Sequence, residues 1–189
     1  PDGDALGSSL AMLLFLEKIG KTAHFIVPSI YPKSLDWLPG LAEVNIMDEA
    51  EDDCIALLNA ADVHIILDYN DWIRVDKFGK FAEKSRAQRI LIDHHLNPQI
   101  LCDVNFSFPN YSSTAELVWD ILNGFDPTHN WMDRHICANI LVGILTDTGS
   151  FAHNLRPELF EKVAKLMHFG IHYELIHNLC FNNLEVKQL

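Results

Sequence analysis

The chain is short of positive charge, of cysteine and of long apolar stretches. Only 14 of its 189 residues are Lys or Arg, against 26 Asp or Glu, so a formal net charge of −12 repels a polyanion unless metal ions or a local basic face reverse the field. The 4 cysteines form no CxxC pair, which excludes a disulfide framework. Apolar runs fall far short of the roughly 20 residues that a bilayer span needs. We therefore expect a soluble, cytoplasmic protein that contacts no membrane and does not coat nucleic acid passively.

What the chain does have is apolar material for a core, 49% of its residues, without internal repeats or low-complexity segments. Short apolar runs predict strands, and the stretches between them predict helices. The expected strands cover residues 23–27, 44–47, 63–67 and 89–92, and the expected helices lie near 33–38, 50–60 and 72–86. This alternation is typical of an α/β domain with a mostly parallel sheet and helices on both faces.

Helices flank this alternating region on both sides. Asp4 can cap an N-terminal helix that Gly20 stops. The segment Ser113, Thr114, Ala115, Glu116 has the form of a capping box, which predicts a helix to about residue 123. Further helices are expected over residues 132–145 and 157–169. The second half of the domain is therefore expected to be helical.

Two carboxylates, Asp2 and Asp4, stand on either side of Gly3 at the start of the first helix. The glycine lets the backbone come close, so both side chains can point at a common volume and hold a cation. A solvated turn with an aspartate cap explains the same residues equally well.

Asp68 directly follows the apolar run 63–67. Ligands of α/β proteins gather beyond the carboxyl ends of the strands, which makes Asp68 a candidate site residue. It can equally cap a helix, although Asp71 suits that role better. Arg74 lies one turn further on, where it can pair with either aspartate.

A second strand end carries the triplet Asp93, His94, His95. Neutral imidazoles ligate Mn²⁺ or Zn²⁺, and an adjacent carboxylate can fix their tautomer through the other ring nitrogen. A single histidine would more often be structural, whereas two after an aspartate favour a site.

Asp147 ends an apolar helix and, taken alone, marks only a helix end that Gly149 stops. Asp147 becomes a candidate site residue only together with the other candidate residues. Together the set is Asp2, Asp4, Asp68, His94 and Asp147, with His95 in reserve. Carboxylates that converge without cations raise each other's pKa values, so such a cluster is stable only with metal bound. Oxygen-rich ligation with one imidazole suits Mn²⁺, and two ions about 3.5–4 Å apart suit phosphoryl transfer.

In this order the clusters resemble the motifs of the DHH phosphoesterase superfamily, which is named for its Asp-His-His triplet. Pro1 to Asp4 match the end of its first motif, HxNPDxD, while Asp68 matches the second motif and Thr146 to Gly149 the fourth. The resemblance covers the whole chain and is greatest to the nanoRNase/pAp phosphatase branch, the bifunctional oligoribonucleases. It implies a DHH catalytic domain over 1–189, cut from a longer protein at both ends. The family's substrate-gripping associated domain, with its glycine-rich GGGH segment, is not in this chain.

The resemblance also implies two Mn²⁺ ions. One would be held by the histidine of the first motif, which lies before Pro1, by Asp2 and by Asp68. The ligands of the other would be Asp4, Asp68, His94 and Asp147. Because the histidine of the first motif is not in the chain, the first metal site is incomplete here.

The resemblance also implies roles for single residues of the site. His95 would touch the substrate phosphate, Asp93 would orient a neighbouring imidazole, and Asp68 would bridge the ions. Arg74 and His153 are weaker candidates for contact with the substrate.

The implied activity is hydrolysis of short oligoribonucleotides, adenosine 3′,5′-bisphosphate or both, by two-metal activation of water. The alternatives are a RecJ-like single-strand exonuclease, a cyclic-dinucleotide phosphodiesterase, an inorganic pyrophosphatase and a non-catalytic nucleotide-binding module. A processive exonuclease would need a larger basic channel than the 14 Lys and Arg residues of this chain suggest. The expected partners are a short RNA or nucleotide phosphate and, in a homodimer, a second copy of the chain.

Overall fold

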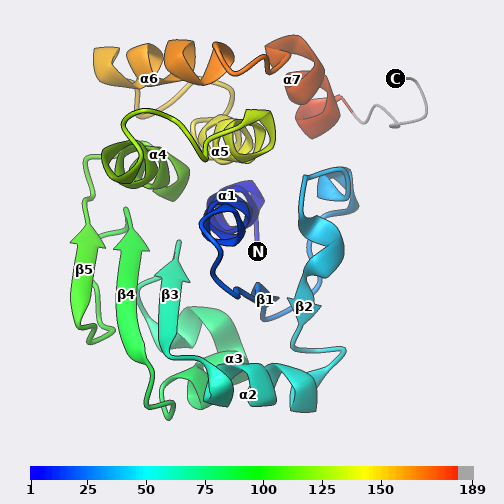
Figure 1. Ribbon diagram of the computed structural model, residues 1–189, viewed down its shortest axis with the longest axis vertical. Helices are drawn as coiled ribbons and strands as arrows, with labels where there is room; N and C mark the ends of the chain where they lie inside the picture. The colour runs from blue at the N-terminus through cyan, green and yellow to red at the C-terminus, as the bar shows by residue number, and fades with distance from the viewer. Residues whose placement is uncertain (183–189) are drawn as a thin grey trace.

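The computed structural model describes residues 1–182 and consists of helices and short parallel strands (Figure 1). The helices are α1 Gly3–Lys18, α2 Glu51–Ala60, α3 Asp76–Ala82, α4 Thr114–Phe125, α5 Arg134–Asp147, α6 Pro157–Met167 and α7 Tyr173–Phe181. The strands are β1 Ile26–Val27, β2 Asn45–Ile46, β3 Val63–Leu67, β4 Gln88–Asp93 and β5 Val104–Ser107. Short 3₁₀ helices lie at η1 Lys33–Leu35, η2 Leu41–Glu43 and η3 Trp72–Val75.

Every strand pair among the described residues is parallel. The strands form a three-stranded sheet in the order β3-β4-β5 and a separate pair, β1-β2. In the larger sheet Ile65 lies opposite Ile90, and Ile90 lies opposite Val104. The predicted α/β class with parallel strands and a helical second half is confirmed.

Side chains alternate between the two faces of the three-stranded sheet, as the two-residue period of a strand requires. On one face Ile65 and Ile92 join the main core beneath α1 and α4. On the opposite face Ile66 and Leu91 form a smaller cluster with Trp72 of η3. Helical segments therefore cover both faces, and the loops after β3 and β4 open toward α1 (Figure 1).

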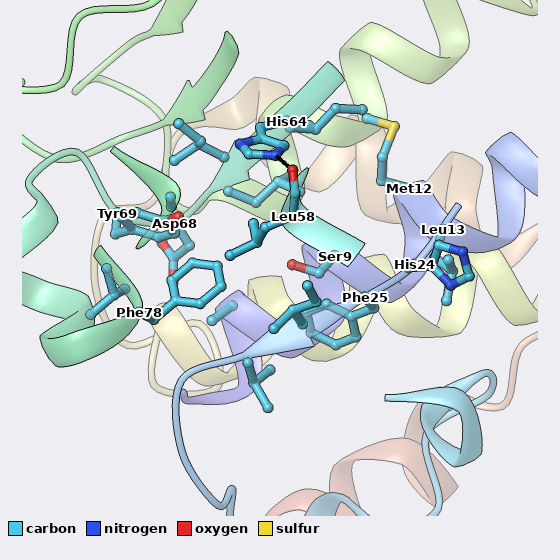
Figure 2. A pocket seen from close by; sticks show the side chains of 18 of the residues that line it. Ser9, Met12, Leu13, His24, Phe25, Leu58, His64, Asp68, Tyr69 and Phe78 are labelled. Carbon is cyan, nitrogen blue, oxygen red and sulfur yellow. Dashed lines mark hydrogen bonds between the residues drawn. The ribbon is translucent and has the colours of Figure 1, made fainter. Parts of the chain in front are cut away.

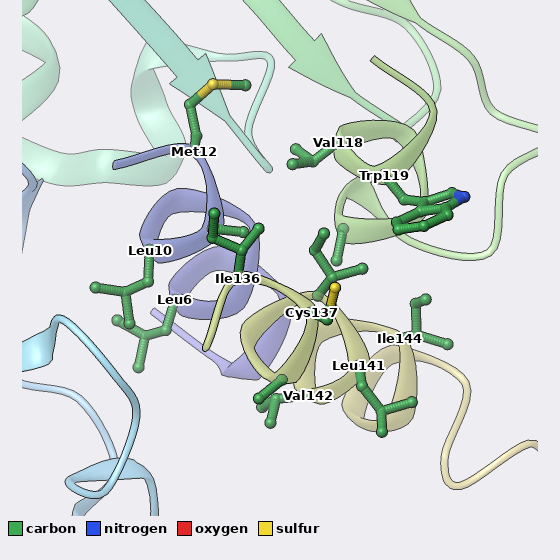
Figure 3. Packing of buried hydrophobic residues seen from close by; sticks show 14 of the residues in the cluster. Leu6, Leu10, Met12, Val118, Trp119, Ile136, Cys137, Leu141, Val142 and Ile144 are labelled. Carbon is green, nitrogen blue, oxygen red and sulfur yellow. The ribbon is translucent and has the colours of Figure 1, made fainter. Parts of the chain in front are cut away.

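The main core lies where α1, α4 and α5 meet. Figure 3 shows buried apolar side chains on these three helices, which lie close together. The fully buried members include Leu6, Leu10, Val118, Trp119, Ile136, Leu141 and Ile144. Burial of each side chain of this size contributes roughly 1.5–3 kcal/mol to stability. Helices α4 and α5 therefore form a rigid platform for α1.

Two glycines allow α1 and α5 to cross closely. A Cβ at Gly7 would collide with the backbone carbonyl of Asn139, and a Cβ at Gly143 would lie 2.7 Å from Asp4 Oδ1 and collide with the Ala115 methyl group. The first turn of α1 therefore lies against the last turns of α5.

Several local predictions are corrected. The strand predicted at 23–27 is paired only at Ile26–Val27, because Pro28 follows and β2 matches it over two residues. The helix predicted at 33–38 is the single turn η1, since Pro39 disfavours a helical Leu38. The helix predicted at 72–86 is divided into η3 and α3 at Asp76, whose φ of 47° breaks the helical path. Strand β5 is an element that the sequence pattern does not predict.

The start of α1 also differs from prediction. Asp2, not Asp4, is the cap: its Oδ1 accepts the backbone N–H groups of Asp4 and Ala5, each at 3.0 Å. The end of the helix is as predicted, with Gly20 in the left-handed region at φ 78°. The carboxylate of Asp4 is thereby left for contacts outside its own helix.

Within the described residues, no helix combines the length and the apolar character that crossing a membrane requires.

The close crossing of α1 and α5 predicts a specific cost for a methyl group at Gly143. Gly143→Ala should destabilise the protein by about 1–3 kcal/mol through overpacking, which lowers its Tm by roughly 2–4 °C per kcal/mol for a chain of this size. The control is Gly124→Ala in α4, where a Cβ meets nothing within 4 Å and the Tm should stay or rise. Equal Tm values for the two variants in a thermal melt would contradict the packing described here.

Candidate metal centre

Four elements that are distant in sequence deliver acidic and imidazole groups to one place. Asp4 lies in the first turn of α1, Asp68 follows β3, His94 follows β4 and Asp147 is the last residue of α5. The loops that follow parallel strands lie at the same edge of the sheet, and the close packing of α5 on α1 brings Asp147 to that edge.

Asp4 of α1 is 1% exposed, and its carboxylate lies against the N-terminus of α4. Its Oδ2 accepts the backbone N–H of Thr114 at 2.7 Å, and its Oδ1 accepts that of Ala115 at 2.9 Å. A helix N-terminus favours an anion through its free N–H groups and its dipole. The carboxylate of Asp4 is therefore fixed in orientation by α4.

His94 is held with one ring nitrogen and leaves the other free. Its Nδ1 donates to the carbonyl oxygen of Tyr111 at 3.3 Å, which assigns the proton to Nδ1 because a carbonyl can only accept. Its Nε2 is buried and has no hydrogen-bond partner among residues 1–182. This nitrogen lies 3.3 Å from Asp147 Oδ2, 3.8 Å from Asp68 Oδ1 and 3.9 Å from Asp4 Oδ2.

Crowding of negative charge perturbs these carboxyl groups. Burial raises the pKa of Asp4, and the charges of Asp147 and Asp2 raise it further, although the N–H groups of Ala115 and Thr114 oppose the rise. Burial and the charges of Asp4 and Asp2 likewise raise the pKa of Asp68, and burial raises that of Asp147. The ionised cluster is consequently unfavourable without a compensating cation.

The residues present fit a divalent metal. Ligand atoms of Asp4, His94 and Asp147 lie within 4.8 Å of one another, and so do those of Asp68, His94 and His95. The lone pair of the free His94 Nε2 points into the group of carboxylates, and Tyr111 fixes the tautomer that provides it, as a metal-ligating histidine requires. A ligand set of carboxylate oxygens and imidazole suits Mn²⁺ and related ions rather than a thiolate-bound metal.

His95 and Asp93 form a second unit beside this cluster. Asp93 is fully buried, and its Oδ1 lies 2.7 Å from His95 Nδ1 while its Oδ2 accepts the backbone N–H of His95 at 2.9 Å. The hydrogen bond that the His95 ring donates to Asp93 is the main cause of a raised pKa of His95. Asp93 therefore orients His95 and favours its protonated form.

The remaining predicted residues lie at different distances from this centre. Asp2 caps α1 through Oδ1, and its charge acts on Asp4, Asp68 and Asp147. Arg74 lines the same cavity as Asp68 and His95, but among the described residues it makes no ion pair with Asp68 or Asp71. Asp71 instead caps η3, as predicted.

His153 is exposed, and its ring lies beside Gly149. It belongs neither to the metal-ligand groups nor to the residues that line the cavity.

Sequence reasoning missed the part played by Thr114. Its Oγ1 donates to Asp68 Oδ1 at 2.9 Å, and its backbone N–H donates to Asp4, so one residue orients two of the clustered carboxylates. The capping box at Ser113–Glu116 was the available signal, because a helix N-terminus binds anions, but a sequence does not show which carboxylate it receives.

Residues 1–144 match the family described as "DHH family, N-terminal domain". The chain belongs to the DHH family. This confirms the family that the order of motifs indicates, and the DHH triplet itself is Asp93, His94 and His95.

The chain is also similar to two proteins that share one name. The chain is 30% identical over 174 residues to the bifunctional oligoribonuclease and PAP phosphatase NrnA of Thermus thermophilus, covering 90% of this chain and 48% of that protein. It is 27% identical over 191 residues to the protein of the same name from Bacillus subtilis, covering 100% of this chain and 55% of that protein. The chain thus spans about half the length of these DHH relatives.

The fold agrees with a solved DHH-type structure. An exopolyphosphatase-related protein from Bacteroides fragilis superimposes with a TM-score of 0.94 at 33% sequence identity, over 100% of this chain and 55% of that one.

The crowded charge predicts that a neutral residue at position 68 stabilises the metal-free protein. Asp68→Asn keeps the shape of the side chain, can still accept a hydrogen bond from Thr114 and tolerates the backbone φ of 65°. In EDTA the Tm of the variant should therefore exceed that of the wild type by about 2–4 °C for each kcal/mol of repulsion that the substitution removes. Mn²⁺ at 100 times its Kd should stabilise the wild type by about 2.7 kcal/mol and the variant far less.

Asp71→Asn is the matched control, because Asp71 follows the same strand and caps η3 outside the cluster. It should show the full metal-induced rise in Tm. An Asp68→Asn variant that melts lower in EDTA, or that responds to Mn²⁺ like the wild type, would refute the interpretation of the cluster.

Proposed function

We propose that the protein is a metal-dependent phosphoesterase that hydrolyses short oligoribonucleotides, adenosine 3′,5′-bisphosphate or both, with Mn²⁺ as its ion. The observation that carries this proposal is the free Nε2 of His94 among the carboxylates of Asp4, Asp68 and Asp147. Buried acids that raise each other's pKa values in this way are typical of functional sites. The names of the NrnA relatives support the choice of substrates.

The ligands proposed for one ion are Asp4, Asp68, His94 and Asp147, and Asp2 with Asp68 would contribute to a second. Bound divalent ions lower the pKa of water and neutralise the charge that grows on a phosphoryl group. The chain's own residues keep these ligands aimed: α4 fixes Asp4, Thr114 holds Asp68, and Tyr111 sets the tautomer of His94.

His95 and Arg74 are proposed to bind the substrate phosphate. The Nδ1 of His95 is engaged by Asp93, which leaves Nε2 to donate to a phosphate oxygen. Since the hydrogen bond to Asp93 favours the protonated ring, this donor carries positive charge toward an anionic substrate. The guanidinium of Arg74, which lines the same cavity, adds a second cation to a chain that has few.

The proposal includes a strand that precedes Pro1. A cavity of about 880 Å³ separates β1 from β3, and each of these strands is the edge of its sheet on that side. Figure 2 shows this space bordered by Phe25 beside β1, Ser9 of α1 and His64 of β3, with Asp68 at one end. A parallel strand there would join the two sheets and bring its last residues beside Asp68, where the histidine of the first motif, HxNPDxD, could complete the first metal site.

Other expectations of the sequence stay predictions. They are the associated substrate-gripping domain, a homodimer and a cytoplasmic location.

The proposal predicts Mn²⁺-dependent hydrolysis by the full-length protein. In a panel of RNA dinucleotides, adenosine 3′,5′-bisphosphate, cyclic di-AMP, single-stranded DNA and pyrophosphate, the first two should give the highest kcat/KM. His95→Gln should lower kcat/KM by about 10²-fold or more, because a charged donor to the phosphate is lost.

His168→Gln is the control, since the side chain of His168 is exposed at the end of α6 and its Nδ1 lies 2.7 Å from the Ala164 carbonyl oxygen. No Mn²⁺-dependent turnover of any substrate would favour a nucleotide-binding module and overturn the proposal. Preference for pyrophosphate or long DNA would overturn the choice of substrates alone.

A further inference from the structure

The segment Tyr111–Ala115 touches three of the clustered ligands at once. The carbonyl of Tyr111 accepts from His94, the hydroxyl of Thr114 donates to Asp68, and the N–H groups of Thr114 and Ala115 donate to Asp4. Ligand atoms at a metal must hold their directions within narrow limits. The position of this one segment therefore affects three ligands together.

On its far side the same segment is anchored to Glu116, which is fully buried. Glu116 Oε2 accepts both the backbone N–H and the hydroxyl of Ser112, at 2.8 and 2.9 Å. These bonds fold the segment back over the first turn of α4. The side chain of Glu116 thus ties the segment to the helix that it precedes.

Two cations near or on α6 hold Glu116 in turn. Arg156, the residue before α6, donates to both carboxylate oxygens at 2.6 and 2.8 Å, and Lys162 donates to Oε1 at 2.7 Å. Burial alone would raise the pKa of Glu116, but the bonds from Lys162 and Ser112 outweigh it and lower the pKa. Glu116 is therefore a buried charge with full compensation.

The aromatic ring of Tyr111 is held by the same cations. The Arg156 guanidinium lies 5.1 Å and the Lys162 ammonium 4.5 Å from the ring centre. The Tyr111 hydroxyl donates to Asp120, which also accepts from Lys162 at 2.6 Å. Tyr111 and Ser112 are consequently both fastened to one group of charges outside the metal centre.

We propose that Glu116, Arg156 and Lys162 are positioning residues: by fastening Tyr111–Ala115, they hold Asp4, Asp68 and His94 in the directions that a bound metal needs. This inference rests on the proposed metal centre. Among the described residues, Glu116 belongs to neither group of metal-ligand candidates, and none of the three side chains lines the cavity beside Asp68, so we place their effect in the segment.

The test measures metal affinity rather than turnover. Mn²⁺ binding to the full-length protein is followed by titration calorimetry and by the electron paramagnetic resonance spectrum of the bound ion, with thermal melts alongside. Glu116→Gln keeps the shape of the side chain and removes its charge. It should raise the Kd for Mn²⁺ about tenfold, in the range expected for residues that orient metal ligands, and broaden the spectrum.

Lys162→Met is the second variant, because it leaves Arg156 on Glu116 and disturbs folding less; its Kd should rise by a smaller factor. Asp133→Asn is the matched control, since Asp133 also combines a helix cap with a lysine ion pair, to Lys18 at 2.9 Å, but at the far end of α5. Its Tm should fall while its Kd stays within about twofold of the wild type, well inside the changes expected at metal-orienting positions.

Two results separate this inference from the proposed function. A wild-type Kd in Glu116→Gln and Lys162→Met, with only their Tm values lowered, would show a purely structural network and overturn this inference alone. Failure of the wild type to bind Mn²⁺ would overturn the metal centre and this inference together.

Discussion

Repulsion between buried carboxylates is the constraint on which the rest of the structure depends. Asp4 and Asp68 lie in the low-dielectric interior, where burial raises their pKa values. The charges of Asp147 and Asp2 raise the pKa of Asp4 further, and those of Asp4 and Asp2 raise the pKa of Asp68 further. Such an arrangement destabilises the metal-free protein. Proteins retain it where attraction to a bound cation offsets the repulsion between the carboxylates. The core of α1, α4 and α5 supplies the rigidity that keeps these groups from moving apart.

The fold offsets part of this repulsion before any ion arrives. The N-terminus of α4 directs two N–H groups at Asp4, and Thr114 gives a hydroxyl to Asp68. These donors also orient the carboxylates, so the same bonds that reduce the electrostatic cost define the ligand geometry. The charge network around Glu116 connects that geometry to α6, which carries none of the proposed metal ligands.

The sequence predicts much of this arrangement because strand ends and acidic residues coincide. The run at Val63–Leu67 is found as β3 with the predicted bounds, and β4 is within one residue at each end. Strand β5 escapes prediction since its side chains are mostly polar or half exposed, which removes the apolar signal. The roles of Tyr111 and Thr114 escape it for another reason: they act through tertiary contacts over 17 and 46 positions, which no local pattern encodes.

The central claim is that Asp4, Asp68, His94 and Asp147 jointly bind a divalent metal. The most direct test is anomalous diffraction at the manganese absorption edge from crystals of the full-length protein grown with Mn²⁺. The account predicts a strong anomalous peak at coordination distance from His94 Nε2 and from carboxylate oxygens of these aspartates. A well-ordered cluster with no such peak, or manganese bound only elsewhere, would contradict it.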